Sequence, residues 1–321
     1  MKTLLRLFVI LLLGIGGTVG YMVNFENDYL YFPTRELTQT PHNAGLSFRN
    51  IRFKSEDGVA LHGWYMPHAH ARFTLLHLHG NGGNVSDRIR QYRLWHAMGL
   101  AVFAFDYRGY GLSEGTPGEA GLDADAKAAW ALLVKKNGID PDKIIIAGRS
   151  LGCAVAAKLA AEVNPAGLAL EAPFTNIPDM SAAYYPWLPL RWFVKTRLDT
   201  EAAVRESSVS LLLISAESDE IIPEGMADRV FAAHHGPKLR GAFPGGHNDF
   251  DVVSKRPYFK LWQHWLDTLE TAKSSQPIWV RHQPDVKPGI QSPEITRQRF
   301  NSTEAHSPWL SRRTSVSPSA T

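Results

Sequence analysis

The motif Gly148-Arg149-Ser150-Leu151-Gly152 holds a serine with glycine two positions before it and two positions after it. Residues 144–147 before the motif are apolar and mostly β-branched, whereas residues 153–162 after it are mainly strong helix formers. A nucleophilic serine on a tight strand-to-helix turn needs this spacing, because side chains at the flanking positions would collide with neighbouring backbone. The start of the following helix directs its amides and positive dipole end at the site. The motif therefore predicts Ser150 as the nucleophile of an acyl transfer.

A second stretch, residues 111–115 (GLSEG), matches the same pattern, so the pattern alone is only modest support for a nucleophilic serine. This stretch follows a polar loop and leads into further glycine and proline instead of a helix. We therefore interpret Ser113 as a loop serine.

The serine hydroxyl needs a base to take its proton, and thirteen histidines are available. Most of them lie in predicted strands, at a helix end or in the C-terminal region. His247 differs, because it follows two glycines in a loop between a predicted strand at 238–243 and a predicted helix at 250–271. We predict His247 as the base.

An acid must hold the imidazole in the right tautomer and stabilise its charged form. The leading candidate is Asp219, in the loop that leaves a predicted strand at 211–214. Glu171, at the end of a strand predicted at 168–170, is the alternative. In some enzymes with this chemistry the acid follows the strand that precedes the usual one. Glu220 is adjacent to Asp219 but is expected to point elsewhere on the loop.

The oxygen that becomes negative during acyl transfer needs two backbone donors. One is the amide of Leu151, the residue after the nucleophile. The other is expected from the glycine-rich run 79–84 (HGNGGN), where glycines allow the backbone to turn its amides inward. We assign it to the amide of Asn81. The alternative is a glycine loop that is needed only for the turn.

Strand-like and helix-like segments alternate along the body of the chain. Residues 46–54 alternate with period two, and the Asp57-Gly58 turn pairs them with a strand at 60–66. Further strands are expected at 73–78, 100–105, 144–147, 168–170, 211–214 and 238–243. Helices are expected at 86–98, 120–136, 151–163, 225–233 and 250–271. This alternation predicts an α/β fold with a mostly parallel sheet and helices on both faces.

Composition excludes several classes of function. The chain is 44% hydrophobic and 20% charged, as in ordinary globular proteins with a sizeable core. The net charge of +3 arises from the excess of basic residues in 276–321, so the body lacks the basic face that nucleic-acid binding needs. The single cysteine, Cys153, excludes an internal disulfide and a multi-cysteine metal site, and its place in a predicted helix favours burial over catalysis. We expect no metal, organic cofactor or nucleic-acid partner.

The N-terminal residues indicate a membrane association. Lys2 and Arg6 precede an uncharged stretch at residues 7–23, which is at the short end of what spans a bilayer. A secretory signal peptide would be cleaved near Gly20, but no Ala-x-Ala site is present. We therefore expect an uncleaved single-pass anchor, with secretion as the alternative. The positive charge on the amino side predicts that the body lies on the non-cytoplasmic side.

Seven stretches, in order over roughly residues 28–272, match a family pattern. They are 31–33 (YFP), 57–65 (DGVALHGWY), 79–84 (HGNGGN), 106–111 (DYRGYG), 148–152 (GRSLG), 171–174 (EAPF) and 219–223 (DEIIP). With them the chain resembles the membrane-anchored branch of the α/β-hydrolase superfamily, related to serine aminopeptidase-like (S33-type) hydrolases. Two positions depart from the pattern: Ala216 stands where glycine is usual, and Gly82 where alanine is usual.

The resemblance implies the α/β-hydrolase fold, a mostly parallel twisted sheet with helices on both faces and a short cap insert. It also implies a triad of Ser150, Asp219 and His247, with an oxyanion hole from the amides of Asn81 and Leu151. The expected regions are an anchor or signal peptide at 1–24, a hydrolase domain at 25–275 with the cap at about 174–208, and a disordered tail at 276–321.

The expected reaction is hydrolysis of a small-molecule ester or thioester through an acyl-enzyme on Ser150. A short cap predicts an open pocket and faster cleavage of short acyl chains. The alternatives are an aminopeptidase-like hydrolase and a membrane-tethered scaffold that keeps the fold without turnover. Asn84-Val85-Ser86 is a glycosylation pattern beside the oxyanion loop, where a glycan would obstruct the site. This favours the periplasm of a bacterium.

Overall fold

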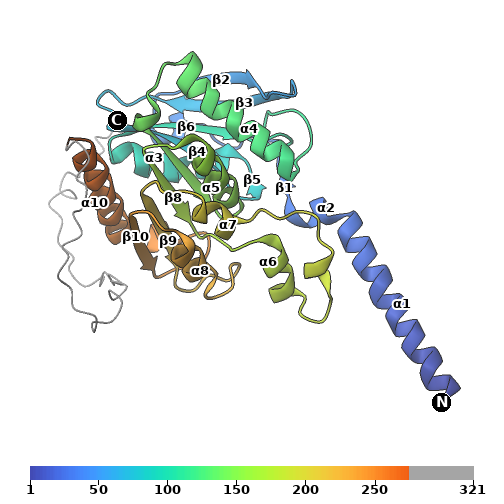
Figure 1. Ribbon diagram of the computed structural model, residues 1–321. Helices are drawn as coiled ribbons and strands as arrows, with labels where there is room; N and C mark the ends of the chain where they lie inside the picture. The colour runs from blue at the N-terminus through green and yellow to red at the C-terminus, as the bar shows by residue number, and fades with distance from the viewer. Residues whose placement is uncertain (275–321) are drawn as a thin grey trace, which may run out of the picture.

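An eight-stranded sheet forms the centre of the molecule in the computed structural model, which describes residues 1–274 (Figure 1). The strand order is β10-β9-β8-β7-β4-β6-β3-β2. The strands from β10 to β6 run parallel, and β3 and β2 are each antiparallel to the preceding strand. The predicted mostly parallel sheet is thus confirmed. Its strands are β2 (Arg49–Lys54), β3 (Ala60–Met66), β4 (Phe73–Leu78), β6 (Leu100–Asp106), β7 (Ile144–Arg149), β8 (Gly167–Glu171), β9 (Leu211–Ala216) and β10 (Lys238–Phe243).

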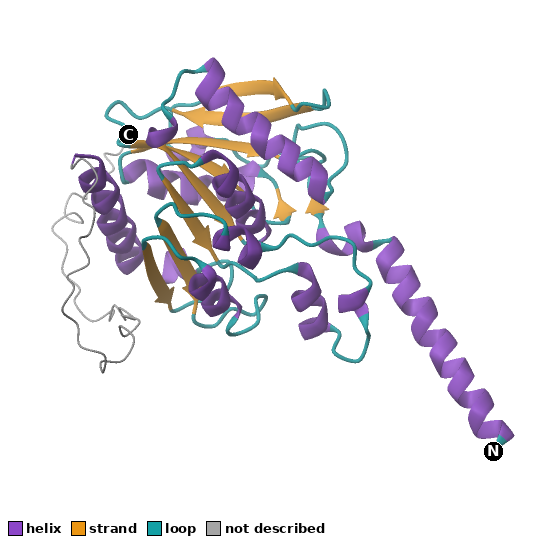
Figure 2. Cartoon of the chain, viewed as in Figure 1, coloured by secondary structure: helices purple, strands orange, loops and turns teal. Residues whose placement is uncertain are grey.

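Helices cover both faces of the sheet (Figure 2). Successive side chains of a strand point to opposite faces, so Leu76 and Leu75 of β4 belong to two different hydrophobic clusters. The Leu76 cluster contains residues of α4 (Glu119–Ala131), α5 (Leu151–Val163), α7 (Thr200–Arg205) and α8 (Met226–Ala233). The Leu75 cluster contains residues of α3 (Ile89–Ala97), α9 (Phe250–Val253) and α10 (Lys255–Ser274).

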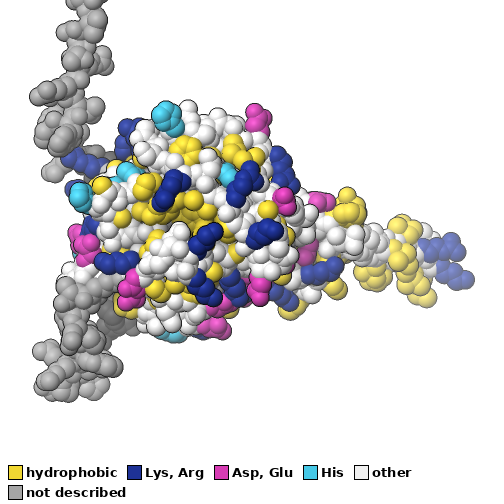
Figure 3. Space-filling model, turned by 90° about the horizontal axis from the view of Figure 1, so that it is seen from above, with side chains coloured by type: hydrophobic (Ala, Val, Ile, Leu, Met, Phe, Trp, Pro, Cys, Tyr) yellow, Lys and Arg dark blue, Asp and Glu magenta, His cyan; other side chains and the backbone are white. Residues whose placement is uncertain are grey.

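The N-terminal helix α1 (Lys2–Asn24) projects away from this body, with hydrophobic side chains along it and basic ones near its tip (Figure 3). Its 23 residues have a mean hydropathy of 2.0 in their most apolar window. At 1.5 Å per residue the helix is long enough to cross a hydrocarbon core of about 30 Å. Length and composition fit both a membrane anchor and a signal sequence.

A short helix and a small second sheet connect α1 to the body. Helix α2 (Glu26–Leu30) follows α1, and β1 (Phe32–Pro33) pairs in parallel with β5 (Gly82–Gly83). Sequence patterns did not predict these elements, since a two-residue strand has no periodicity. They place the segment after α1 beside the glycine-rich run that contains Asn81.

Between β8 and β9 the chain forms α6 (Ile177–Tyr184), the 3-10 turn η5 (Leu190–Trp192) and then α7. Helix α7 packs against α5 and α8, so it belongs to the layer that covers the sheet. The part of the predicted insert that stands off the sheet is therefore residues 177–194, which we call the cap. It lies beside α2 and the end of α1 (Figure 1).

The helical segments differ from the predictions in three places. The helix expected at 250–271 is two helices, α9 and α10, because the chain breaks at Ser254, whose hydroxyl donates to the carbonyl of Pro244. Helix α4 ends in a π-helical turn, η3 (Leu132–Lys136). The helix expected at 86–98 begins as a 3-10 turn, η2 (Val85–Arg88). The remaining short 3-10 turns are η1 (Pro41–Ala44) and η4 (Pro141–Lys143). The tail predicted at 276–321 lies outside the described residues.

Candidate active site

Ser150 lies on a sharp turn between β7 and α5, with φ 52° and ψ −121°. This region of backbone space is unfavourable for a residue with a side chain and costs about 1–3 kcal/mol. The flanking glycines are needed for packing: a Cβ on Gly148 would lie 2.4 Å from the carbonyl oxygen of Gly152, and one on Gly152 would lie 2.0 Å from that of Leu78. The turn therefore has the strained strand-to-helix geometry that the spacing predicted.

His247 and Asp219 lie together beyond the ends of β10 and β9. The imidazole Nδ1 of His247 is 2.9 Å from Oδ2 of Asp219 and 3.0 Å from Oδ1. The Asp219 Oδ1 also accepts hydrogen bonds from the backbone amides of Ile221 and Ile222, at 2.9 and 2.7 Å. Burial acts to raise the pKa of Asp219, but the hydrogen bonds from His247 and these amides outweigh it and hold the pKa below its ordinary value. An ionised Asp219 that accepts the Nδ1 proton leaves Nε2 as the basic nitrogen.

Ser150 and His247 both line one cavity of about 530 Å³. Its walls also include polar side chains such as Thr34, Arg88 and Asn248. It is the more polar of two cavities that meet at Ser150, and we call it the polar cavity. The structure thus brings Ser150 and His247 to one cavity, with Asp219 hydrogen-bonded to His247 behind it, although the three residues are far apart in the sequence.

The two amides predicted to bind a negative oxygen also lie at Ser150. Leu151 is the first residue of α5, and Asn81 lines the same polar cavity as Ser150. Within residues 1–274 neither backbone amide has a hydrogen-bond acceptor. The neighbouring Gly80 permits the close approach, since a Cβ there would lie 3.4 Å from the Cβ of Ser150.

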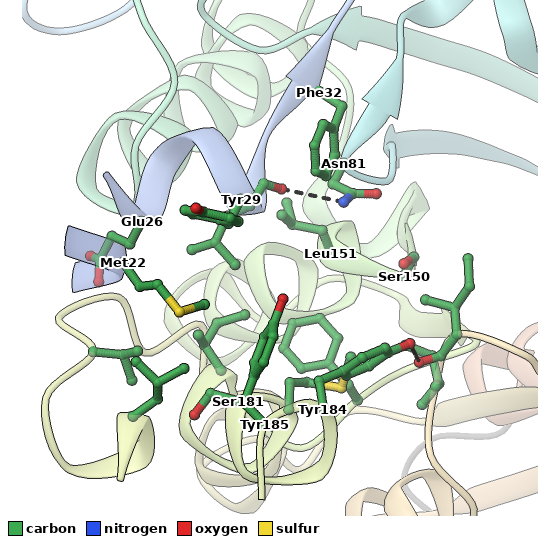
Figure 4. A pocket seen from close by; sticks show the side chains of 18 residues that line it. Met22, Glu26, Tyr29, Phe32, Asn81, Ser150, Leu151, Ser181, Tyr184 and Tyr185 are labelled. Atoms are coloured by element: carbon green, nitrogen blue, oxygen red, sulfur yellow. Dashed lines mark hydrogen bonds between the residues drawn. The ribbon is translucent and has the colours of Figure 1, made fainter. Parts of the chain in front are cut away.

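The backbone at Asn81 is fixed by the N-terminal segment. Its carbonyl accepts hydrogen bonds from the amide of Phe32, at 3.0 Å, and the hydroxyl of Tyr110, at 2.8 Å. The Asn81 side-chain amide donates to the carbonyl of Leu30 at 3.3 Å (Figure 4). The backbone contacts set the direction of the peptide group that follows Asn81, and the sequence analysis did not foresee them.

A second cavity, of about 410 Å³, also reaches Ser150 and is mostly apolar (Figure 4). Asn81, Ser150 and Leu151 line it next to the reacting hydroxyl. Its remaining walls come from the cap, from the N-terminal segment that includes α1, α2 and β1, and from Phe174, Ile221 and Ile222. We call it the apolar cavity. Its size falls within the range of pockets that enclose drug-sized ligands.

Comparison with known proteins identifies the family. An uncharacterised protein of Mycobacterium tuberculosis is 35% identical over 263 residues, covering 81% of this chain and 93% of that protein. The α/β hydrolase domain-containing protein WAV2 of Arabidopsis thaliana is 31% identical over 298 residues, covering 82% and 96%. This chain belongs to the α/β-hydrolase family. The family model described as serine aminopeptidase, S33, matches residues 69–198.

Solved structures agree with this fold. An esterase of Pyrococcus furiosus, Pf2001, superposes with a TM-score of 0.61 at 20% identity, covering 74% of this chain and 97% of that one. An α/β hydrolase of Vibrio vulnificus superposes with a TM-score of 0.60 at 24% identity, covering 77% and 92%. Both comparisons show the α/β-hydrolase fold of this chain.

In this α/β hydrolase the alternative acid, Glu171, belongs to a separate buried network. Its carboxylate accepts hydrogen bonds from Gln91 and Tyr258, each at 2.5 Å, and lies 3.5 Å from the guanidinium of Arg149. Burial raises the pKa of Glu171 to about 7. The structure does not bring Glu171 to the imidazole of His247, whose Nδ1 contacts Asp219.

Two charged residues hold the backbone of His247, and the sequence analysis missed both. The Oε2 of Glu220 accepts a hydrogen bond from the His247 amide at 2.9 Å, and Nη2 of Arg149 donates to its carbonyl at 3.0 Å. Glu220 therefore points away from the acid's position at the imidazole, as expected, but its contact with the His247 backbone was not foreseen. One signal was Gly246, because a Cβ there would lie 2.5 Å from the Glu220 carboxylate.

The hydrolase buries the other residues that the sequence singled out. Ser113 is fully buried; its hydroxyl donates to the carbonyl of Asp106 at 2.6 Å and accepts from the amide of His62 at 2.9 Å, which confirms a structural serine. Cys153 and Asn84 are buried as well, so the glycosylation pattern at Asn84 gives no reason to prefer one cellular compartment. Within residues 1–274 no three His, Cys, Asp or Glu side chains form a group that could hold a metal ion.

Proposed function

We propose that this protein is a serine hydrolase that cleaves acyl esters or thioesters through an acyl-enzyme on Ser150. The observation that carries the proposal is the Asp219–His247 pair, with Nδ1 to Oδ2 at 2.9 Å, whose histidine lines one cavity with Ser150. Its support is twofold: membership of the α/β-hydrolase family, and the strained turn that presents the Ser150 hydroxyl.

In the proposed reaction the Ser150 oxygen attacks the carbonyl carbon while Nε2 of His247 takes the hydroxyl proton. The amides of Leu151 and Asn81 donate to the carbonyl oxygen as it becomes negative. The bond to the leaving group then breaks, and His247 returns the proton to the departing oxygen or sulfur. A water molecule, deprotonated by His247, hydrolyses the acyl-enzyme and restores Ser150.

The two cavities determine how the acyl group and the leaving group of the substrate are oriented. The leaving group takes its proton from His247, so it must lie on the side of the imidazole. His247 lines the polar cavity and not the apolar one. The acyl group therefore occupies the apolar cavity, and a polar alcohol or thiol occupies the polar cavity.

The apolar cavity also bears on the aminopeptidase alternative. A free α-amino group beside the reacting carbonyl would need a carboxylate partner. The carboxylate in the lining of this cavity is that of Glu26. It already accepts hydrogen bonds from the backbone amides of Lys195 and Thr196, at 2.9 and 3.0 Å. An aliphatic acyl group fits the lining better than an amino acid.

We expect purified full-length protein to hydrolyse p-nitrophenyl acyl esters and acyl thioesters at least about 100-fold faster, in kcat/KM, than aminoacyl p-nitroanilides. The reason is that an ammonium group buried in the apolar cavity would lack a partner. Release of p-nitrophenol, thiol and p-nitroaniline measures the three reactions. A preference for the aminoacyl anilides would instead support the aminopeptidase alternative.

We also propose that α1 anchors the protein in a membrane with the hydrolase domain on the non-cytoplasmic side, as the basic Lys2 and Arg6 suggest. In cells that express the full chain, we expect the protein to stay in the membrane fraction after alkaline carbonate extraction, and a periplasm-specific reporter fused after Ser274 to be active. Release at a mass smaller by about twenty residues would show a cleaved signal peptide instead.

A further inference from the structure

The apolar cavity extends from Ser150 to the end of the N-terminal helix. Met22 of α1 and Glu26 and Tyr29 of α2 line it together with Ser150. Figure 4 shows Ser150 at one side of the cavity and Met22 and Glu26 at the opposite side. The far wall is therefore built by the segment in which the proposed membrane helix joins the body.

Hydrogen bonds hold this segment, the cap and the acid loop together. The Glu26 carboxylate of α2 accepts from the backbone amides of Lys195 and Thr196, just beyond the cap, and from the Thr196 hydroxyl at 2.8 Å. The Tyr184 hydroxyl of the cap donates to the carbonyl of Ile221 at 2.7 Å, two residues after Asp219. The membrane helix thus ends in a unit that is continuous with the candidate active site.

The cap exposes large aromatic side chains to solvent. Trp187, Trp192 and Phe193 are 71%, 74% and 55% exposed. The cations Arg191 and Lys195 are also on the surface in this segment. Exposed tryptophan with neighbouring Lys or Arg is typical of segments that lie in the headgroup region of a bilayer.

Exposed aromatic side chains also lie at the end of α1. Tyr21 and Phe25 are 58% and 43% exposed, at the point where the apolar span gives way to the acidic residues of α2. Aromatic residues at this depth of a membrane helix mark the interface between hydrocarbon and water. The cap lies beside the end of α1 (Figure 1), so both sets of aromatics belong to elements that line the apolar cavity.

We infer that the apolar cavity binds the long acyl chain of an ester or thioester that is dissolved in the same bilayer as α1, and that the chain enters laterally between α1 and the cap. The inference rests on the proposed function and names its substrate class: a membrane amphiphile whose polar leaving group occupies the polar cavity. It replaces the expectation of short-chain preference, because residues 177–194 and the N-terminal segment together wall the cavity.

The test uses the full chain reconstituted in phosphatidylcholine vesicles, with p-nitrophenyl butyrate and p-nitrophenyl palmitate as substrates that share one leaving group. We expect kcat/KM for palmitate in the same vesicles to exceed that for butyrate at least about tenfold, because the added methylenes fill the apolar cavity. Palmitate ester supplied in separate vesicles should be hydrolysed at least about tenfold more slowly, because lateral entry requires substrate and protein in one bilayer.

A bulky residue at the far wall should shorten the accepted chain. Met22→Trp should lower kcat/KM for palmitate at least about tenfold more than kcat/KM for butyrate, so the palmitate-to-butyrate ratio should fall at least about tenfold. Asn24→Trp is the matched control, since Asn24 is exposed on the same helix and does not line the cavity; it should change neither rate. Butyrate turnover also reports whether each variant is folded.

The cap aromatics are tested in the same vesicles. The double variant Trp187→Ser, Trp192→Ser should lower palmitate turnover about tenfold with butyrate unchanged, because the cap loses its apolar contact with the bilayer. Val253→Ser removes an exposed apolar side chain from α9 and should have no effect. Faster hydrolysis of butyrate than palmitate, with a ratio unaffected by Met22→Trp, would overturn the inference and leave the serine hydrolase intact. No hydrolysis of either ester by wild type would overturn the proposed function itself.

Discussion

Replacing Ser150 with alanine should lower kcat for ester hydrolysis on the order of 10⁶-fold, the scale measured when a serine protease loses its nucleophile. The expected loss is large because no acyl-enzyme can form without the hydroxyl, whereas the amides of Leu151 and Asn81 remain in place. The measurement is release of p-nitrophenol from an acyl ester, with circular dichroism to show that the variant is folded.

The control is the serine of the second glycine motif. Ser113→Ala should keep most of the activity, but it should lower the melting temperature, because the buried amide of His62 loses its acceptor. If Ser113→Ala abolished turnover in folded protein while Ser150→Ala did not, the nucleophile would belong to the other motif.

Removing the charge of Asp219 should cost on the order of 10⁴-fold in kcat, since Asp219→Asn turns the His247 imidazole to the wrong tautomer. Glu171→Gln should remain within about tenfold of wild type, because its carboxylate contacts Gln91 and Tyr258. The steady-state rates of the two variants on one ester decide between the two acids.

The triad members should act as one unit. Asp219→Asn in a Ser150→Ala background should therefore change the residual rate very little, in contrast to its effect in wild type. A Glu171→Gln variant without activity, beside an Asp219→Asn variant within about tenfold of wild type, would assign the acid to β8.

Local motifs predicted the strand-to-helix turn well. Gly148 and Gly152 are glycines because backbone atoms lie close to where a Cβ would be. For Gly148 the closest of these atoms belongs to Gly152 of the same motif, whereas for Gly152 they belong to Leu78 and His79. The sequence also distinguished the nucleophile candidate Ser150 from the loop serine Ser113. A run of helix formers follows Ser150, whereas a loop with glycine and proline follows Ser113. The eight-stranded sheet followed from the same alternation of segments.

Other features depend on contacts between distant parts of the chain. The Glu220 carboxylate meets the His247 amide 27 residues away, and adjacency to Asp219 gave no indication of its direction. Phe32 and Leu30 fix Asn81 through hydrogen bonds over about fifty residues of sequence, and the strand that pairs at this contact, β1, has only two residues.

The N-terminal segment is the clearest example of a contact that sequence patterns do not predict. Its apolar run predicted a membrane helix, but no pattern in it indicated that Met22 lines a cavity shared with Ser150. A short cap alone implied an open pocket. The cap and the N-terminal segment together line a cavity of about 410 Å³, and for this reason we propose longer acyl chains than the sequence analysis expected.

Labelling with a fluorophosphonate probe shows whether Ser150 is an activated nucleophile. We expect the full-length wild-type protein to react with the probe, mass spectrometry of its peptides to find the adduct on Ser150, and Ser150→Ala and His247→Ala to lose the label. An adduct on another residue would assign the nucleophile elsewhere, and a folded wild-type protein that stays unlabelled would favour a membrane-tethered scaffold with the hydrolase fold.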